Sequence, residues 1–163
     1  MPGNCRILSV ALLSLVLALA AGTRAGADAV GPSTRSTGAA LTPGEHAVVR
    51  VMNSVRASHG VPPLRVGRAL TRAARAHSVD MARRGYFDHG AFVRRLRSFG
   101  VRAPYVGENL AAGTTPLTAA EIVQMWVESP PHRENLLDRG FSRVGVGVAG
   151  GSTRLVTADF AGR

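Results

Sequence analysis

The segment WVESPPHRENLLDRGFSRVGVGV, residues 126–148, contains the signals that decide how the chain folds. Ser129 has the chemistry of a helix N-cap, and Pro130 follows at the first helical position, where its missing N–H costs nothing. We therefore expect one helix to end near Glu128 and another to begin at Pro130. His132 is then the third residue of the new helix and faces the positive end of its dipole, which disfavours the imidazolium. A neutral imidazole can bind a metal ion or accept a proton.

The same segment ends in a strand. Valines occupy every second position of residues 144–148, which is the period of a half-buried strand. Residues 150–152 are typical of a turn, and residues 155–160 predict a strand that returns along the first. Gly145 and Gly147 lie inside the first strand, where glycine permits a neighbouring element to pack closely. The segment therefore predicts a terminal β-hairpin.

Upstream, the apolar residues recur with the period of helices. The first predicted helix opens with residues that resemble a capping box, Thr42-Pro43-Gly44-Glu45. The helix that ends at Glu128 opens with another capping box at residues 118–121. In that last helix we expect Ile122, Met125 and Trp126 to face inward. Residues 61–64 predict an extended connector and residues 105–112 a short strand. The predicted helices span residues 42–59, 68–84, 91–99 and 118–128. Helices followed by a hairpin indicate an α+β domain.

The N-terminal 27 residues predict a secretory signal peptide. A basic residue precedes an apolar run at residues 7–21, and Ala25-Gly26-Ala27 has the small residues of a cleavage site. The run is shorter than the about 20 residues of a membrane span. We expect cleavage after Ala27, a flexible linker over residues 28–41 and a secreted domain over residues 42–163 without a transmembrane span. An uncleaved anchor is the alternative.

The amino-acid composition limits the kinds of partner that the domain can bind. Cys5, the only cysteine, leaves with the signal peptide, so the mature domain has no disulfide and no cysteine metal ligand. All 20 basic residues are arginine, and the formal net charge is +10. The arginines are spread along the chain and are not interleaved with aromatic residues, which argues against nucleic-acid binding. We expect a monomer with a weak attraction to anionic polymers or lipid head groups.

Three ionisable residues lie beside tight turns or aromatic residues on separate segments: His89, Glu108 and His132. Two imidazoles and a carboxylate, with water as a fourth ligand, suit an open zinc-type site. Spacing alone leaves their convergence open, and each has a structural interpretation: Glu108 can brace a loop, and His132 can hydrogen-bond across a cleft. His77, on the apolar side of its helix, is interpreted as a hydrogen-bonded core residue. No phosphate loop, dinucleotide fingerprint or HExxH motif is present.

The order of these motifs resembles the bacterial branch of the CAP superfamily, which includes cysteine-rich secretory proteins, insect venom antigen 5 and plant pathogenesis-related proteins. The segments that carry the resemblance are VMNSVRASHGVPPL (51–64), LTRAARAHSVDMA (70–82), FDHG (87–90), GENLAAG (107–113) and MWVESPPHRENLLDRGFSRVGVGV (125–148). The resemblance covers residues 41–160. It implies a three-layer α-β-α sandwich with a central antiparallel sheet and a cleft over that sheet.

The cleft of the family commonly carries two histidines and two glutamates. The resemblance implies that His89, Glu108 and His132 are three of these four. The fourth position corresponds to Ser129 here, and Glu128 is one residue out of register, which turns it by about 100° on a helix. Glu128 is therefore only a possible surrogate, and we expect a reduced site.

Three functions follow as alternatives. The favoured one is a secreted, non-enzymatic binding domain whose cleft holds zinc or another divalent metal, a lipid or a cell-envelope ligand. The second is a metal-assisted hydrolase or protease-like enzyme. Glu108, Ser129 and His132 are residues of the types that such enzymes use, but we assign none of them a catalytic role. The third is a structural interaction module of the envelope in which the three polar residues only stabilise the fold.

Overall fold

The computed structural model describes residues 40–114 and 116–163. The predicted signal peptide and nearly all of the predicted linker lie outside these residues. Five helices and four strands are described. They are α1 (Pro43–Ser58), β1 (Arg65–Val66), α2 (Arg68–Arg84), α3 (Phe92–Ser98), β2 (Tyr105–Thr114), α4 (Ala119–Glu128), α5 (Pro130–Leu137), β3 (Phe141–Gly150) and β4 (Thr153–Gly162).

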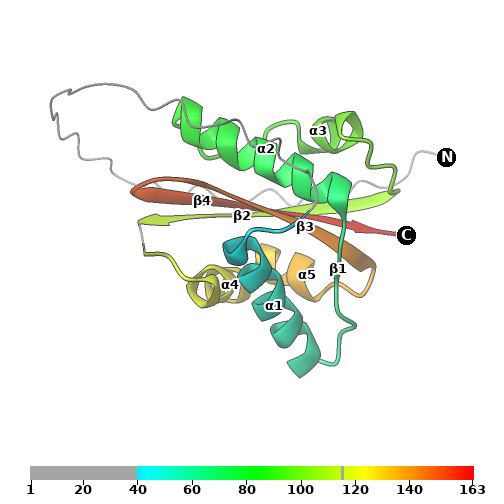
Figure 1. Ribbon diagram of the computed structural model, residues 1–163. Helices are drawn as coiled ribbons and strands as arrows, with labels where there is room; N and C mark the ends of the chain where they lie inside the picture. The colour runs from blue at the N-terminus through cyan, green and yellow to red at the C-terminus, as the bar shows by residue number, and fades with distance from the viewer. Residues whose placement is uncertain (1–39, 115) are drawn as a thin grey trace, which may run out of the picture.

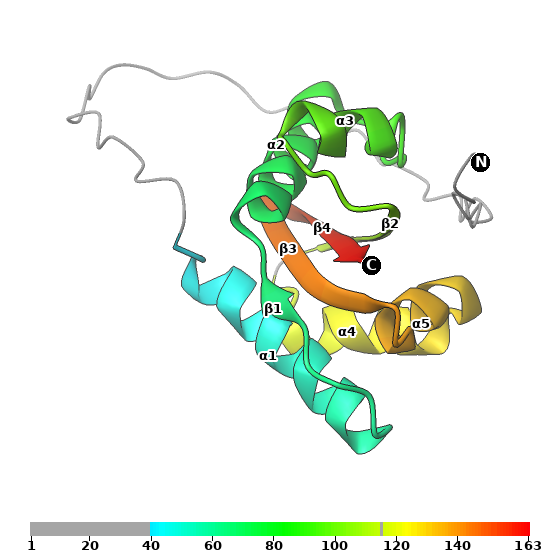
Figure 2. The ribbon, with the colours of Figure 1, turned by 90° about the vertical axis from the view of Figure 1, so that its right-hand side faces the viewer.

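The elements form three layers around one sheet. The strand order is β1-β3-β4-β2. Helices α2 and α3 cover one face of the sheet, and α1, α4 and α5 cover the other, as two perpendicular views show (Figures 1 and 2). The predicted α+β class and three-layer sandwich are confirmed. The sheet is mixed rather than purely antiparallel, because the short β1 pairs with β3 in parallel. We expected only an extended connector before α2, and two residues beyond it pair with β3.

The helix boundaries follow the local signals. Capping boxes open α1 at Thr42 and α4 at Thr118, where each threonine accepts a hydrogen bond from the backbone of a glutamate three residues later. Helix α5 begins at Pro130, as expected, with Ser129 at the N-cap position. The Ser129 hydroxyl makes no capping hydrogen bond, so that part of the prediction is wrong. The first two helical residues are prolines without an N–H, which leaves few donors for a cap.

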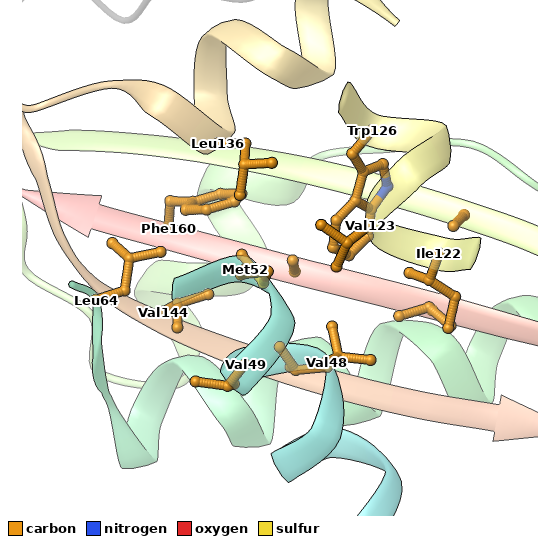
Figure 3. Packing of buried hydrophobic residues seen from close by; sticks show 14 of the residues in the cluster. Val48, Val49, Met52, Leu64, Ile122, Val123, Trp126, Leu136, Val144 and Phe160 are labelled. Carbon is orange, nitrogen blue, oxygen red and sulfur yellow. The ribbon is translucent and has the colours of Figure 1, made fainter. Parts of the chain in front are cut away.

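The main core lies between the sheet and the helices α1, α4 and α5. In Figure 3, Met52 from α1 lies between Phe160 of β4 on one side and Trp126 and Ile122 of α4 on the other. Trp126 is fully buried and donates its indole N–H to the carbonyl oxygen of Leu110. The expected inward position of Met125 is wrong. Its side chain is exposed, and the third inward residue of α4 is Val123.

On the opposite face of the sheet, two glycines of β3 allow α2 to lie close to the strand. A Cβ on Gly145 would lie 2.1 Å from the backbone of Leu70 and Thr71, and a Cβ on Gly147 would lie 2.3 Å from the backbone nitrogen of Arg75. Real Cβ atoms do not come this close to a backbone, so only glycine allows α2 to lie on β3. The prediction that these glycines permit close packing is confirmed.

A buried arginine fixes the position of α5. Arg56 of α1 is fully buried and donates hydrogen bonds to the carbonyl oxygens of Leu136, Asp138 and Phe141. These carbonyls lie at and just after the end of α5, where a helix leaves its last carbonyls without partners inside the helix. Arg56 therefore ties α1 to the connection between α5 and β3, and so helps to hold His132 in place.

Candidate functional site

Glu108 lies on β2, which is the strand at one edge of the sheet. It pairs across the sheet with Asp159 of β4. Both side chains point toward the α2–α3 face, because the adjacent Asn109 makes its contacts on the α5 side and successive side chains alternate between faces. The Glu108 side chain is 1% exposed and that of Asp159 is fully buried. Two carboxyls therefore lie together under α3.

His89 contacts Glu108 from the loop between α2 and α3. Its Nδ1 lies 2.8 Å from Oε1 of Glu108, and its side chain is 28% exposed. A carboxylate partner fixes the tautomer with the proton on Nδ1, so that Nε2 carries the free lone pair. Burial lowers the pKa of His89. The ring is therefore neutral at neutral pH, and one of its nitrogens is open to a ligand.

Arg95 of α3 holds the two carboxyls. Its Nη2 contacts Oε2 of Glu108 and lies 3.3 Å from Oδ1 of Asp159. Burial nevertheless raises the pKa of Glu108 to about 7, and it raises the pKa of Asp159 well above its usual range. The charge of Glu108 raises the pKa of Asp159 further. Ionisation of Asp159 beside Glu108 is therefore disfavoured.

His132 lies at the third position of α5, as the sequence predicts. Its carbonyl oxygen accepts a hydrogen bond from Nδ2 of Asn109 at 2.9 Å. Burial lowers the pKa of the imidazole, and the nearby His89 lowers it further. The neutral ring that we expected from the helix dipole is thus favoured mainly by burial. The effect of His89 on the pKa of His132 indicates that the His89 ring lies within electrostatic range of His132.

Two asparagines hold the site together. Asn135 of α5 donates through Nδ2 to the backbone oxygen of Glu108 at 3.2 Å and to Oδ1 of Asn109 at 3.0 Å. Together with the bond from Asn109 to His132, these contacts attach α5 to the edge strand β2. Asn109 and Asn135 are therefore structural braces.

The remaining sequence candidates lie apart from this cluster. Glu128 is exposed, and its Oε1 accepts a hydrogen bond from Nε2 of Gln124 at 2.7 Å. Ser129 is partly buried at the junction of α4 and α5, and no hydrogen bond joins its hydroxyl to His132 in the part of the chain that the structure describes. His77 is 4% exposed and its Nε2 bonds to the carbonyl oxygen of Asp88, while burial lowers its pKa to about 4. His77 is thus a core histidine, as interpreted.

The structure brings His89 and Glu108 into direct contact and places His132 near His89. Over residues 40–114 and 116–163, no group of three or more His, Cys, Asp and Glu side chains has a geometry that could hold a metal ion. The three-ligand set therefore stays a prediction. Within the same ranges, no helix combines the length and the apolar character needed to cross a membrane.

Comparison with known proteins agrees with this architecture. The family model described as "CAP: Cysteine-rich secretory protein family" matches residues 49–160. This chain belongs to the CAP family. The uncharacterized protein YkwD of Bacillus subtilis is 36% identical over 137 residues, which cover 80% of this chain and 52% of that protein. The CAP chain thus spans about half the length of this relative.

Solved CAP structures share the fold. An extracellular protein with an SCP domain from Bacillus anthracis is 28% identical, with a TM-score of 0.65, over 76% of this chain and 45% of that one. A cysteine-rich secretory protein from Staphylococcus aureus is 20% identical, with a TM-score of 0.62, over 73% of this chain and 38% of that one. The CAP fold and bacterial relatives expected from the motifs are confirmed.

The motifs did not point to Arg95 and Asp159, which contact Glu108 from α3 and β4. Asp159 had a detectable signal, since an acidic residue inside the apolar strand 155–160 is seldom fully buried unless it is paired. Arg95 had none, because arginines occur throughout its helix.

Proposed function

We propose that this CAP protein is a secreted, non-enzymatic binding domain whose cleft takes a divalent transition-metal ion through the imidazoles of His89 and His132. The observation that carries the proposal is the contact between Nδ1 of His89 and Oε1 of Glu108. A carboxylate behind a histidine orients the ring and raises the basicity of its other nitrogen, which is a recurrent arrangement at zinc sites.

The residues present suit a two-histidine site better than a three-ligand one. Both oxygens of Glu108 are engaged, Oε1 by His89 and Oε2 by Arg95, so the carboxylate supports His89 and is not free to act as a ligand. Burial lowers the pKa of both His89 and His132, which keeps their nitrogens unprotonated and able to bind metal at neutral pH. Water would complete the coordination, as in open zinc sites.

Secretion is supported by the predicted signal peptide and by the extracellular relative from Bacillus anthracis. We also propose that the cleft can bind a lipid-like or cell-envelope molecule. A hydrolase has less support, because Ser129 makes no hydrogen bond with His132 within the described residues and therefore lacks an activating base.

Titration calorimetry with zinc tests the proposal. Substitution of either ligand, His89→Ala or His132→Ala, should weaken zinc binding by at least about 10-fold, because loss of one imidazole removes half of the protein ligands. The matched control is Glu128→Gln, which removes a nearby charge outside the cluster and should leave the affinity within about 2-fold.

The pH dependence adds a second readout. Zinc affinity should fall on acidification as protons compete for the imidazoles, and because the pKa of both histidines is lowered, the fall should begin below the ordinary histidine pKa of about 6.5. The proposal fails if zinc does not bind, or if it binds equally well to both histidine variants.

A further inference from the structure

The positive charge of the domain is concentrated on one layer of the fold. Residues 68–102, which comprise α2, α3 and the loop between them, contain nine arginines and two acidic residues, a formal charge of +7. The other described residues contain eight arginines and seven acidic residues, a formal charge of +1. Nearly all of the excess therefore lies on the layer that covers one face of the sheet in Figure 1.

This cationic layer contains a pocket of about 560 Å³ between α2 and α3. Its polar lining includes Asp80, Arg84, Tyr86, Arg94, Arg95 and Ser98. None of the proposed cleft residues lines it. A pocket of this size falls in the range that accommodates small organic ligands, so it has room for more than a bare ion.

The only acidic side chain of the pocket lining is already satisfied. Oδ2 of Asp80 accepts hydrogen bonds from the Tyr86 hydroxyl at 2.5 Å and from Nη1 of Arg84 at 3.3 Å. Arg84 also lies over the ring of Tyr86, at 5.2 Å from its centroid. Asp80 therefore positions Arg84 and Tyr86 at the pocket wall and leaves the other two arginines without a counter-charge from this residue.

Arg94 is the pocket arginine that retains its full binding capacity. It makes no hydrogen bond or ion pair with any residue in the described ranges. Arg95 binds the carboxyls beneath the pocket through Nη2, and its unpartnered Nε is buried below the surface that a ligand in the pocket can reach. Direct contacts with a ligand therefore fall to Arg94 and Arg84.

We propose that this pocket binds the phosphate-ester group of an organic ligand, with Arg94 and Arg84 at the phosphate oxygens. Guanidinium groups match the planar, bidentate geometry of phosphate oxygens, and the +7 layer raises the local concentration of anions around the pocket. The same group occurs in soluble glycerol phosphates and in phospholipid head groups. The site shares Arg95 with the Glu108 cluster but contains neither histidine of the proposed metal site, so it goes beyond the proposed metal function.

The test compares two arginines of α3. Calorimetry with sn-glycerol 3-phosphate should give saturable binding to the full chain, and Arg94→Ala should weaken it by at least about 10-fold, the usual cost of a charged hydrogen bond. Arg97→Ala removes the same charge from the same helix outside the pocket and should change the affinity by less than about 2-fold. An equal loss in both variants would overturn the proposal, because it would indicate diffuse attraction. Inorganic phosphate bound as tightly as the ester would overturn the assignment to an ester.

Vesicles identify the source of the ester. Phosphatidylcholine vesicles with and without phosphatidylglycerol are sedimented with each variant. A lipid head group is supported if binding requires phosphatidylglycerol, is lost in Arg94→Ala and is kept in Arg97→Ala. This holds even if the protein binds sn-glycerol 3-phosphate weakly. Failure of both the soluble ester and the vesicles to bind overturns the proposal. Binding should persist in EDTA and in His132→Ala; loss in EDTA would show that a metal holds the anion and would contradict a site made by the arginines.

Discussion

The face of the sheet under α1, α4 and α5 buries one large group of apolar side chains, whereas the face under α2 and α3 buries fewer apolar side chains together with polar and ionisable ones. The first holds one continuous cluster of sixteen buried apolar residues, among them Trp126 and Phe160. The second holds two clusters of six and three, separated by polar pairs such as Ser78 with Thr157 and Glu108 with Asp159.

This difference between the two faces indicates that one face mainly provides stability and the other carries the ionisable groups. Hydrophobic burial, the dominant stabilising contribution, is concentrated on one face, so the other face can carry groups that are costly to bury. Both proposed sites draw on the polar face: His89 and Glu108 lie at its edge, and the arginine pocket lies between its two helices. Three substitutions test this division.

The largest effect is expected on the apolar face. Trp126→Ala should lower the free energy of unfolding by about 3–5 kcal/mol, because it leaves a large cavity and an unpaired carbonyl at Leu110. Denaturant unfolding followed by circular dichroism measures the loss. A cost below about 1 kcal/mol would show that this cluster is not the main source of stability.

A smaller loss is expected where α2 approaches the sheet. Gly145→Ala places a Cβ 2.1 Å from the backbone of Leu70 and should cost about 1–3 kcal/mol as α2 is pushed away from β3. The matched control is Gly151→Ala, where nothing lies within 4 Å of the new Cβ, and it should leave the unfolding midpoint close to that of the wild type. Equal midpoints for the two variants would contradict the close packing of α2.

The smallest effect, when it is counted over a single pH unit, is expected from the buried carboxyls. The pKa of Glu108 is raised from 4.5 to about 7 in the folded protein, so the folded state binds more protons than the unfolded state between these values. This group therefore costs stability as the pH rises from 4.5 to 7, by at most about 1.4 kcal/mol per pH unit.

Glu108→Gln removes that titration. The unfolding free energy of the variant minus that of the wild type should therefore increase between pH 4.5 and 7 and level off above. Urea titrations at several pH values provide the measurement. The comparison with the wild type is needed because His77, whose pKa is lowered to about 4, gives the opposite trend in both proteins. A difference that stays constant across this range would mean that Glu108 titrates normally.

The local elements could be predicted because their signals are short-range. Capping boxes at Thr42 and Thr118 and the proline at 130 set three helix starts, and alternating valines set β3. Met125 was misplaced because it lies three residues after Ile122 and so fits the helical period. Val123 lies three residues before Trp126, fits the period equally well and is the buried one. The parallel pairing of β1 was missed because two residues carry no periodic pattern.

By itself, the sequence determined the helix and strand order, the room for close packing at Gly145 and Gly147, and His132 at a helix start, since each depends on neighbouring residues or on the absence of a side chain. That α2 is the element packed there was decided by the tertiary structure. Only the tertiary structure decided which ionisable groups meet. Glu108 and Asp159 are 51 positions apart and face each other through strand register, and Arg95 reaches both because α3 packs over that register. The pKa shifts come from burial, and burial depends on the packing of elements that are distant in sequence.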